Sequence, residues 1–108
     1  MSPVVKVVQP VGILDGTQAS RLRQEINDAV TARTDIVLID LESVTFMDSS
    51  GLGALVIALK TVRTAGGKLF LCSINDQVKM LFQLTSMDRV FEIFSNRAEF
   101  NQAVLLPN

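Results

Sequence analysis

Short apolar runs along the chain alternate with longer stretches of helical periodicity. The β-branched run at residues 4–8 predicts a strand. Pro10 interrupts it because proline donates no ladder hydrogen bond, and residues 11–14 continue it past an edge position or a bulge. The nearly continuous apolar run at residues 36–41 is typical of a strand buried on both faces of a parallel or mixed sheet. Two further strands are predicted at residues 68–73 and 90–94.

Between these strands the spacing of apolar residues predicts helices. Apolar residues from Leu22 to Val30 recur on one face of a helix over residues 18–32. Residues 50–65 are apolar nearly all round in their first half, which indicates a helix lying against the sheet. Shorter helices are expected at residues 77–84, capped by residues 75–76, and at 97–105, opening with capping-box spacing from Asn96 to Glu99.

The linking segments complete a pattern of strands alternating with helices. We expect a turn and then a helix cap at residues 15–17, a short connection at 42–45 and a loop at 85–88. Such alternation favours an α/β fold with helices packed on a sheet.

Length, composition and charge narrow the class of protein. The 108 residues predict one domain over residues 1–108 with an ordinary aliphatic core. A net charge of −1 with scattered Lys and Arg gives no electrostatic reason to expect nucleic acid or an anionic membrane as partner. The chain shows no signal peptide, and its longest apolar run is far shorter than the roughly 20 residues of a membrane span, so we expect a cytoplasmic protein.

The residue types present argue against catalysis, metal binding and a cofactor. The chain has no His, which excludes Ser-His-Asp and Cys-His catalysis and every His-containing metal site. Its only cysteine, Cys72, lies in an apolar run and should be a buried, inert thiol. Gly51 and Gly53 do not complete a phosphate-binding loop, and we expect them instead to let a helix start pack closely on its neighbours.

One stretch joins a strand to a helix through an acid, two hydroxyls and two glycines: Phe46-Met47-Asp48-Ser49-Ser50-Gly51-Leu52-Gly53. Asp and Ser are favoured before a helix because their oxygens accept the free N–H groups of its first turn. These N–H groups also favour a negative charge, so a phosphate on Ser49 or Ser50 would meet a favourable backbone and an unfavourable neighbour, Asp48. The residues by themselves leave open that this stretch is only a capped turn.

This eight-residue stretch resembles the signature of bacterial anti-sigma factor antagonists, the single-domain STAS proteins. Weaker similarities follow in the right order over about residues 3–103, at residues 11–15, 36–41, 66–69 and 78–82. The resemblance implies an α/β fold with a mixed sheet of about four or five strands and about four helices, mainly on one face. The chain departs from the family at its front, where the usual N-terminal edge strand should be short or absent.

The resemblance also implies a function, namely transcription regulation by partner switching. Family members bind an anti-sigma factor, which is an ATP-dependent serine kinase, and so release a sigma factor. The kinase phosphorylates the antagonist and a serine phosphatase reverses the modification. Carried over to this chain, the phosphorylated residue is Ser49, Ser50 is a helix cap, and Asp15 matches a family acid near the partner's nucleotide. ATP belongs to the partner, so no cofactor is expected here.

The docking surface should lie where the carboxyl ends of strands meet, with residues 14–16, 47–49 and 73–75 close together. At least one of Met47 and Leu52 should be exposed, because a partner needs an apolar anchor. Asp15→Ala should weaken binding of the kinase without lowering the melting temperature by more than a few degrees, because a surface change typically costs under about 0.5 kcal/mol. The expected partner-binding residues are Asp15, Met47, Asp48, Ser49, Ser50, Gly51 and Leu52.

Two alternatives remain open at this stage. The same fold could serve as a non-phosphorylated STAS scaffold in a sensory or transporter assembly. An enzyme of another class, a small Ser-dependent acyl or phosphoryl transferase using Asp and Lys, is the second alternative. Incubation with ATP, with and without an anti-sigma kinase, would separate the three functions.

Overall fold

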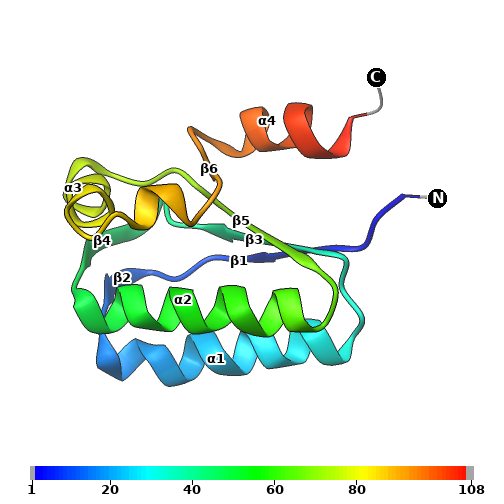
Figure 1. Cartoon of the computed structure of the whole chain (residues 1–108), viewed down its shortest axis with the longest axis horizontal. Helices are drawn as coiled ribbons and strands as arrows, with labels where there is room; N and C mark the ends of the chain where they lie inside the picture. The colour runs from blue at the N-terminus through cyan, green and yellow to red at the C-terminus, as the bar shows by residue number, and fades with distance from the viewer. Residues whose placement is uncertain (1, 107–108) are drawn as a thin grey trace.

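The computed structural model, which describes residues 2–106, is built on two sheets of parallel strands (Figure 1). The four-stranded sheet has the order β1 (Val5–Val8), β3 (Ile36–Asp40), β5 (Lys68–Cys72) and β6 (Ile93–Phe94). The two-stranded sheet pairs β2 (Gly12–Leu14) with β4 (Val44–Met47). The prediction of one domain extends to residues 1 and 107–108, which lie outside the described residues.

Helices lie on the connections between paired strands, and this returns the chain to the same end of the sheet each time. The helices are α1 (Gly16–Thr31), α2 (Ser49–Thr64), α3 (Asp76–Leu84) and α4 (Arg97–Phe100), the last continued by a π-helical turn at Asn101–Leu105. The predicted α/β fold with about four helices is confirmed. Where the resemblance implies a mixed sheet, every strand pair within residues 2–106 is parallel, because each crossover contains a helix.

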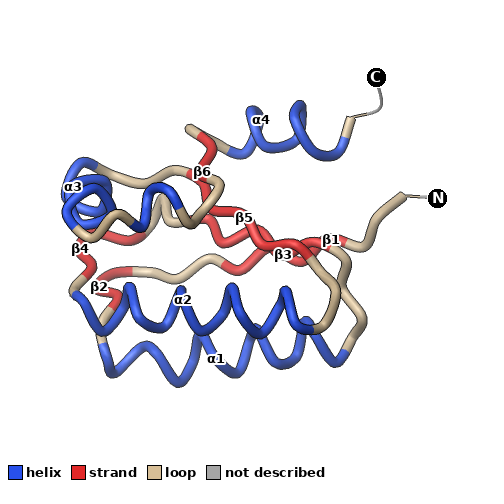
Figure 2. The backbone as a smooth tube through the Cα atoms, in the orientation of Figure 1, coloured by secondary structure: helices blue, strands red, loops and turns tan. Residues whose placement is uncertain are grey.

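The small sheet prolongs the first two strands of the large one. After breaks at residues 9–11 and 41–43, β2 and β4 run on toward the end of the molecule where α1 and α2 begin (Figure 2). Pro10 lies in the first break, and Gly12 follows it with a φ of 82°, a conformation that glycine adopts freely. The expectation of a connection at residues 42–45 is wrong in part, because Val44 and Thr45 begin β4 and Val44 pairs with Gly12 of β2.

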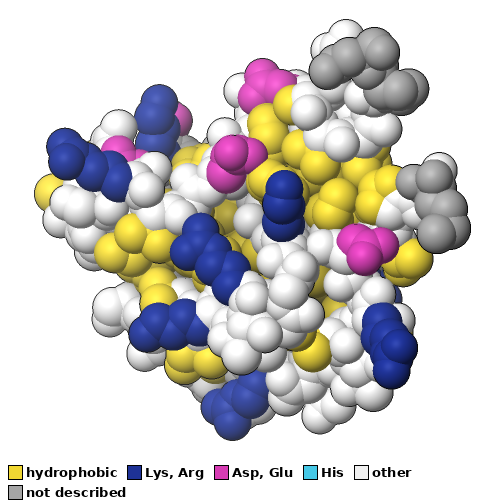
Figure 3. Space-filling model, turned by 45° about the vertical axis from the view of Figure 1, so that its right-hand side comes forward, with side chains coloured by type: hydrophobic (Ala, Val, Ile, Leu, Met, Phe, Trp, Pro, Cys, Tyr) yellow, Lys and Arg dark blue, Asp and Glu magenta, His cyan; other side chains and the backbone are white. Residues whose placement is uncertain are grey.

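The main core lies between the large sheet and the helices on one face. Figure 1 shows α1 and α2 side by side across that face, and the prediction that the helix at residues 50–65 lies against the sheet is confirmed. The opposite face carries a smaller cluster around Phe70, which α4 covers with Phe100, and hydrophobic side chains gather beside α4 in Figure 3. Cys72 belongs to this cluster and is fully buried, as expected, and burial raises the pKa of its thiol.

The last elements differ from the sequence predictions in extent. Asn75 caps α3, as expected, by accepting the N–H of Val78 at 2.9 Å. The strand expected at residues 90–94 is shorter in the structure and consists only of β6. A 3₁₀ turn at Met87–Arg89 comes directly before residue 90, and the chain becomes extended only after it. Asn96 caps α4, while the Glu99 carboxylate accepts the N–H of Ser95. No helix within residues 2–106 has the length and apolarity needed to span a membrane.

Candidate functional site

The carboxyl ends of β2 and β4 bring the predicted switch residues together. Leu14 and Met47 are register neighbours, and the N–H of Asp48 points at the Leu14 carbonyl at 3.4 Å. A Cβ on Gly16 would lie 3.8 Å from the Cβ of Ser50, so the starts of α1 and α2 are in contact. The predicted meeting of residues 14–16 with residues 47–49 is confirmed.

The N-caps of these two helices are both aspartates. The Asp48 carboxylate accepts the N–H of Gly51 at 2.9 Å from extended backbone. The expectation that Ser50 caps this helix is wrong. Asp48 is the N-cap, and Ser49 and Ser50 are the first two residues of the helix. Ser49 and Ser50 are exposed, so neither hydroxyl is committed to holding the helix start.

Asp15 plays the same part for α1. Its carboxylate accepts the backbone N–H of Thr17 at 3.0 Å and the Thr17 hydroxyl at 2.6 Å. The bond from the Thr17 hydroxyl is the main reason why the pKa of Asp15 lies below its usual value. The cap is therefore Asp15 itself, at the front of the expected turn. Because Asp15→Ala removes this helix cap, we expect it to lower stability by more than an ordinary surface substitution would.

Gly51 lets the start of α2 lie directly against the end of β2. A Cβ at this position would stand 2.1 Å from the carbonyl oxygen of Leu14, whereas a Cβ at Gly53 would meet nothing within 4 Å. The expected close packing is confirmed for Gly51 and is wrong for Gly53. The absence of a side chain at Gly51 thus lets the start of α2, which carries Ser49, lie close to the start of α1, which Asp15 caps.

Neither of the two residues expected to anchor a partner is exposed. Met47 is 0% and Leu52 is 6% exposed, so the prediction that at least one of them is exposed is wrong. Met47 faces inward beside Leu14, and Leu52 lies on the face of α2 that packs on the core. The alternation along β4 turns its neighbour Phe46 outward instead.

Side-chain amides of α3 hold β4 in the place of another strand. The Gln77 amide accepts the N–H of Met47 at 2.9 Å and donates to the Met47 carbonyl at 2.8 Å. Asn75 donates to the carbonyls of Val44 and Thr45, each at 3.2 Å. Residues 73–75 therefore contact the start of β4 through Asn75, whereas Gln77, outside the predicted segment, reaches the carboxyl end of β4 at Met47. The sequence analysis missed Gln77, because nothing in the sequence distinguishes it from the other polar residues of this helix.

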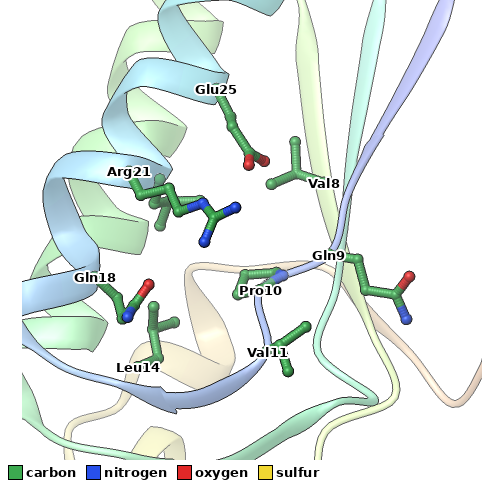
Figure 4. Close-up of a pocket in the computed structure, with 9 residues that line it drawn as sticks. Val8, Gln9, Pro10, Val11, Leu14, Gln18, Arg21 and Glu25 are labelled. Atoms are coloured by element: carbon green, nitrogen blue, oxygen red, sulfur yellow. The ribbon is translucent and has the colours of Figure 1, made fainter.

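A cavity of about 150 Å³ lies between α1 and the link from β1 to β2, and it reaches the end of β2 at Leu14. Arg21 and Glu25 extend from α1 toward that link, where Pro10 and Val8 lie (Figure 4). None of residues 46–53 lines this cavity, so it lies outside the predicted switch stretch. Within residues 2–106 no three side chains of His, Cys, Asp or Glu gather as a metal site would need.

Known proteins similar to this chain agree on one family. The sequence profile described as STAS domain matches residues 2–100. The anti-sigma-B factor antagonist of Listeria monocytogenes is 30% identical over 90 residues, which cover 83% of this chain and 79% of that protein. The anti-sigma F factor antagonist of Paenibacillus polymyxa is 28% identical over 93 residues, or 85% of this chain and 80% of that protein. The crystal structure of an anti-sigma factor antagonist from Mycobacterium paratuberculosis superposes with a TM-score of 0.81 at 26% identity, covering 93% and 85%.

Proposed function

The chain belongs to the STAS domain family, and from this premise we propose that it is an anti-sigma factor antagonist. In this function it is a protein-binding module that sequesters an anti-sigma factor and so releases a sigma factor in the cytoplasm. The observation that carries the proposal is the exposed Ser49 at the first position of α2, beside two capping aspartates. Two relatives named as antagonists match 85% and 83% of the chain.

The finer proposal concerns the partner and its chemistry. The anti-sigma factor is a serine kinase that holds ATP and phosphorylates Ser49, and a serine phosphatase removes the phosphate. Two features support Ser49 as the modified residue. Its side chain is accessible in the folded protein, and Asp48 caps the helix without it. A kinase can therefore reach the hydroxyl without opening α2.

Phosphorylation would act on docking through charge. A phosphoserine carries about −1.5 to −2 charges, and Ser49 follows directly on Asp48. Residues 34–59 contain no Lys or Arg, so the segment that holds the phosphate offers it no cation. Against a partner surface that already holds nucleotide phosphates, the added charge repels. The unmodified form therefore binds the anti-sigma factor and the phosphorylated form releases it.

Mass spectrometry after incubation with the anti-sigma kinase and ATP should place the phosphate on Ser49. The matched control is Ser49→Ala, which should remain unmodified. Phosphate mainly on Ser50, Thr17 or Thr45 would contradict the residue assignment. Stable binding without any phosphate would favour the scaffold alternative, and modification without kinase would favour the transferase.

Ser49→Ala should keep its affinity for the anti-sigma factor, and Ser49→Asp should lose about 2 kcal/mol of it or more, because the added charge is desolvated on docking. The same Asp should stabilise α2 by about 0.3–1 kcal/mol through the helix dipole, so weaker binding would not reflect unfolding. Calorimetric titration measures the affinities. Thr64→Asp adds the same charge at the far end of α2 and serves as the control. Equal affinities for the two Ser49 variants would count against an electrostatic switch.

A further inference from the structure

The outer face of the small sheet carries an apolar pair next to Ser49. Ile13 on β2 and Phe46 on β4 are register neighbours, and they are 54% and 46% exposed. The next pair along the same strands, Leu14 and Met47, points into the core. Because successive residues of a strand face opposite sides, Ile13 and Phe46 share the solvent side of the two-stranded sheet. They form one contiguous surface, called the β2–β4 patch below.

The β2–β4 patch is continuous with the proposed switch. Ile13 lies two residues before Asp15, and Phe46 lies three residues before Ser49. At about 3.3 Å per strand residue, these separations are about 7–10 Å. A docking partner that covers roughly 800 Å² of one surface spans several times that distance. A protein centred on Ser49 and Asp15 would therefore also reach the patch.

A second apolar surface borders the serines on the helical side. A groove of about 290 Å³ runs between α1 and α2, with Ser50 and Ile57 among its lining residues. Its walls consist largely of small side chains, and Ile57 is its only strongly exposed large apolar residue within the described chain. The β2–β4 patch instead presents an aromatic and a branched side chain together, and aromatic residues are frequent centres of protein interfaces.

We propose that the β2–β4 patch is the apolar anchor for the anti-sigma factor, and this inference rests on the function proposed above. The occupant is an apolar cluster on the surface of the anti-sigma factor, seated over Ile13 and Phe46. Asp15 and Ser49 then lie on the polar rim of the same contact, in the arrangement usual for interfaces. A phosphate on Ser49 would be brought against a water-excluding contact, which explains how one modification can control the whole interface.

The test replaces the patch while keeping strand propensity. Ile13→Thr and Phe46→Thr, alone and together, remove apolar area but retain a β-branched residue. Calorimetric titration with the anti-sigma factor should show at least tenfold weaker binding for Phe46→Thr and at least thirtyfold weaker binding for the double variant. Ile57→Ala in the groove and Leu84→Ala on α3 remove comparably exposed side chains and should stay within twofold of the wild type. Thermal melts check that each variant is folded.

A measurement on the wild-type protein covers the case in which the Thr variants do not fold. Hydroxyl-radical labelling of Phe46 should fall in the complex with the anti-sigma factor. Wild-type affinity in the folded patch variants, or unchanged labelling of Phe46, would overturn the anchor and leave the proposed function intact. Loss of affinity in Ile57→Ala alone would place the partner in the groove and overturn it as well. A wild-type protein that does not bind the anti-sigma factor would overturn the proposed function and the anchor together.

Discussion

Gly51→Ala should lower the free energy of unfolding by about 3 kcal/mol or more, the upper range for an overpacked site. The added Cβ would stand 2.1 Å from the Leu14 carbonyl oxygen and 2.8 Å from its carbon, and both are backbone atoms that cannot rotate away. Either α2 moves off β2 or the end of β2 shifts. Both movements separate the two capping aspartates, so partner binding should fall together with stability.

Gly53→Ala is the matched control on the same helix. Its Cβ would meet nothing within 4 Å, and alanine is favoured over glycine inside a helix by about 0.5–1 kcal/mol. This variant should therefore be slightly more stable than the wild type. Urea unfolding of both variants measures the difference as opposite shifts of the midpoint. Midpoints that shift together would show that the close approach at Gly51 does not hold the helix start in place.

Arg97→Ala should cost about 2–3 kcal/mol of unfolding free energy, below the usual range for breaking a fully buried pair. The Arg97 Nε donates to the Asp40 carboxylate at 2.7 Å, and Asp40 is only 1% exposed while Arg97 is 46% exposed. Without the guanidinium, the buried carboxylate keeps only the N–H of Glu42 at 3.0 Å. The contact also fastens the start of α4 to the end of β3, so the loss should loosen α4.

Chemical denaturation of Arg97→Ala and of Arg89→Ala tests this contact. Arg89 is exposed and forms no ion pair within residues 2–106, so its loss should change stability by less than about 0.5 kcal/mol. Adding Asp40→Asn to Arg97→Ala should recover part of the loss, because the unpaired buried charge is then removed. Equal losses for the two arginine variants would show that the pair contributes no more than a surface contact.

Most helices and strands, and the position of the switch stretch, could be predicted from the sequence because they depend on the order of residues within short segments. The buried strand at Ile36–Asp40 is apolar up to its last residue, and α1 repeats apolar residues at helical spacing. Both patterns can be recognised without knowing which other segments pack against them. The stretch around Ser49 was recognisable for the same reason, since strand, acid, hydroxyls and helix are adjacent in sequence.

The choice among neighbouring residues was made by the tertiary structure. Val44–Met47 is a strand because β2 lies beside it and Gln77 holds its other side, and neither contact is visible in four residues of sequence. Asp and Ser are similarly good helix caps, so the docking of α2 on β2 decided for Asp48 over Ser50.

The tertiary structure also decided which face of β4 meets solvent and which residues form the buried ion pair. Alternation along a strand says that Phe46 and Met47 face opposite sides, but only the position of the core says which one meets solvent. Asp40 and Arg97 lie 57 residues apart in the chain, and the fold alone brings them together. Local sequence patterns were thus enough to predict most of the elements, but not β4, and the chemistry of the switch stretch. Packing decided its surface, because burial depends on segments that are distant in sequence.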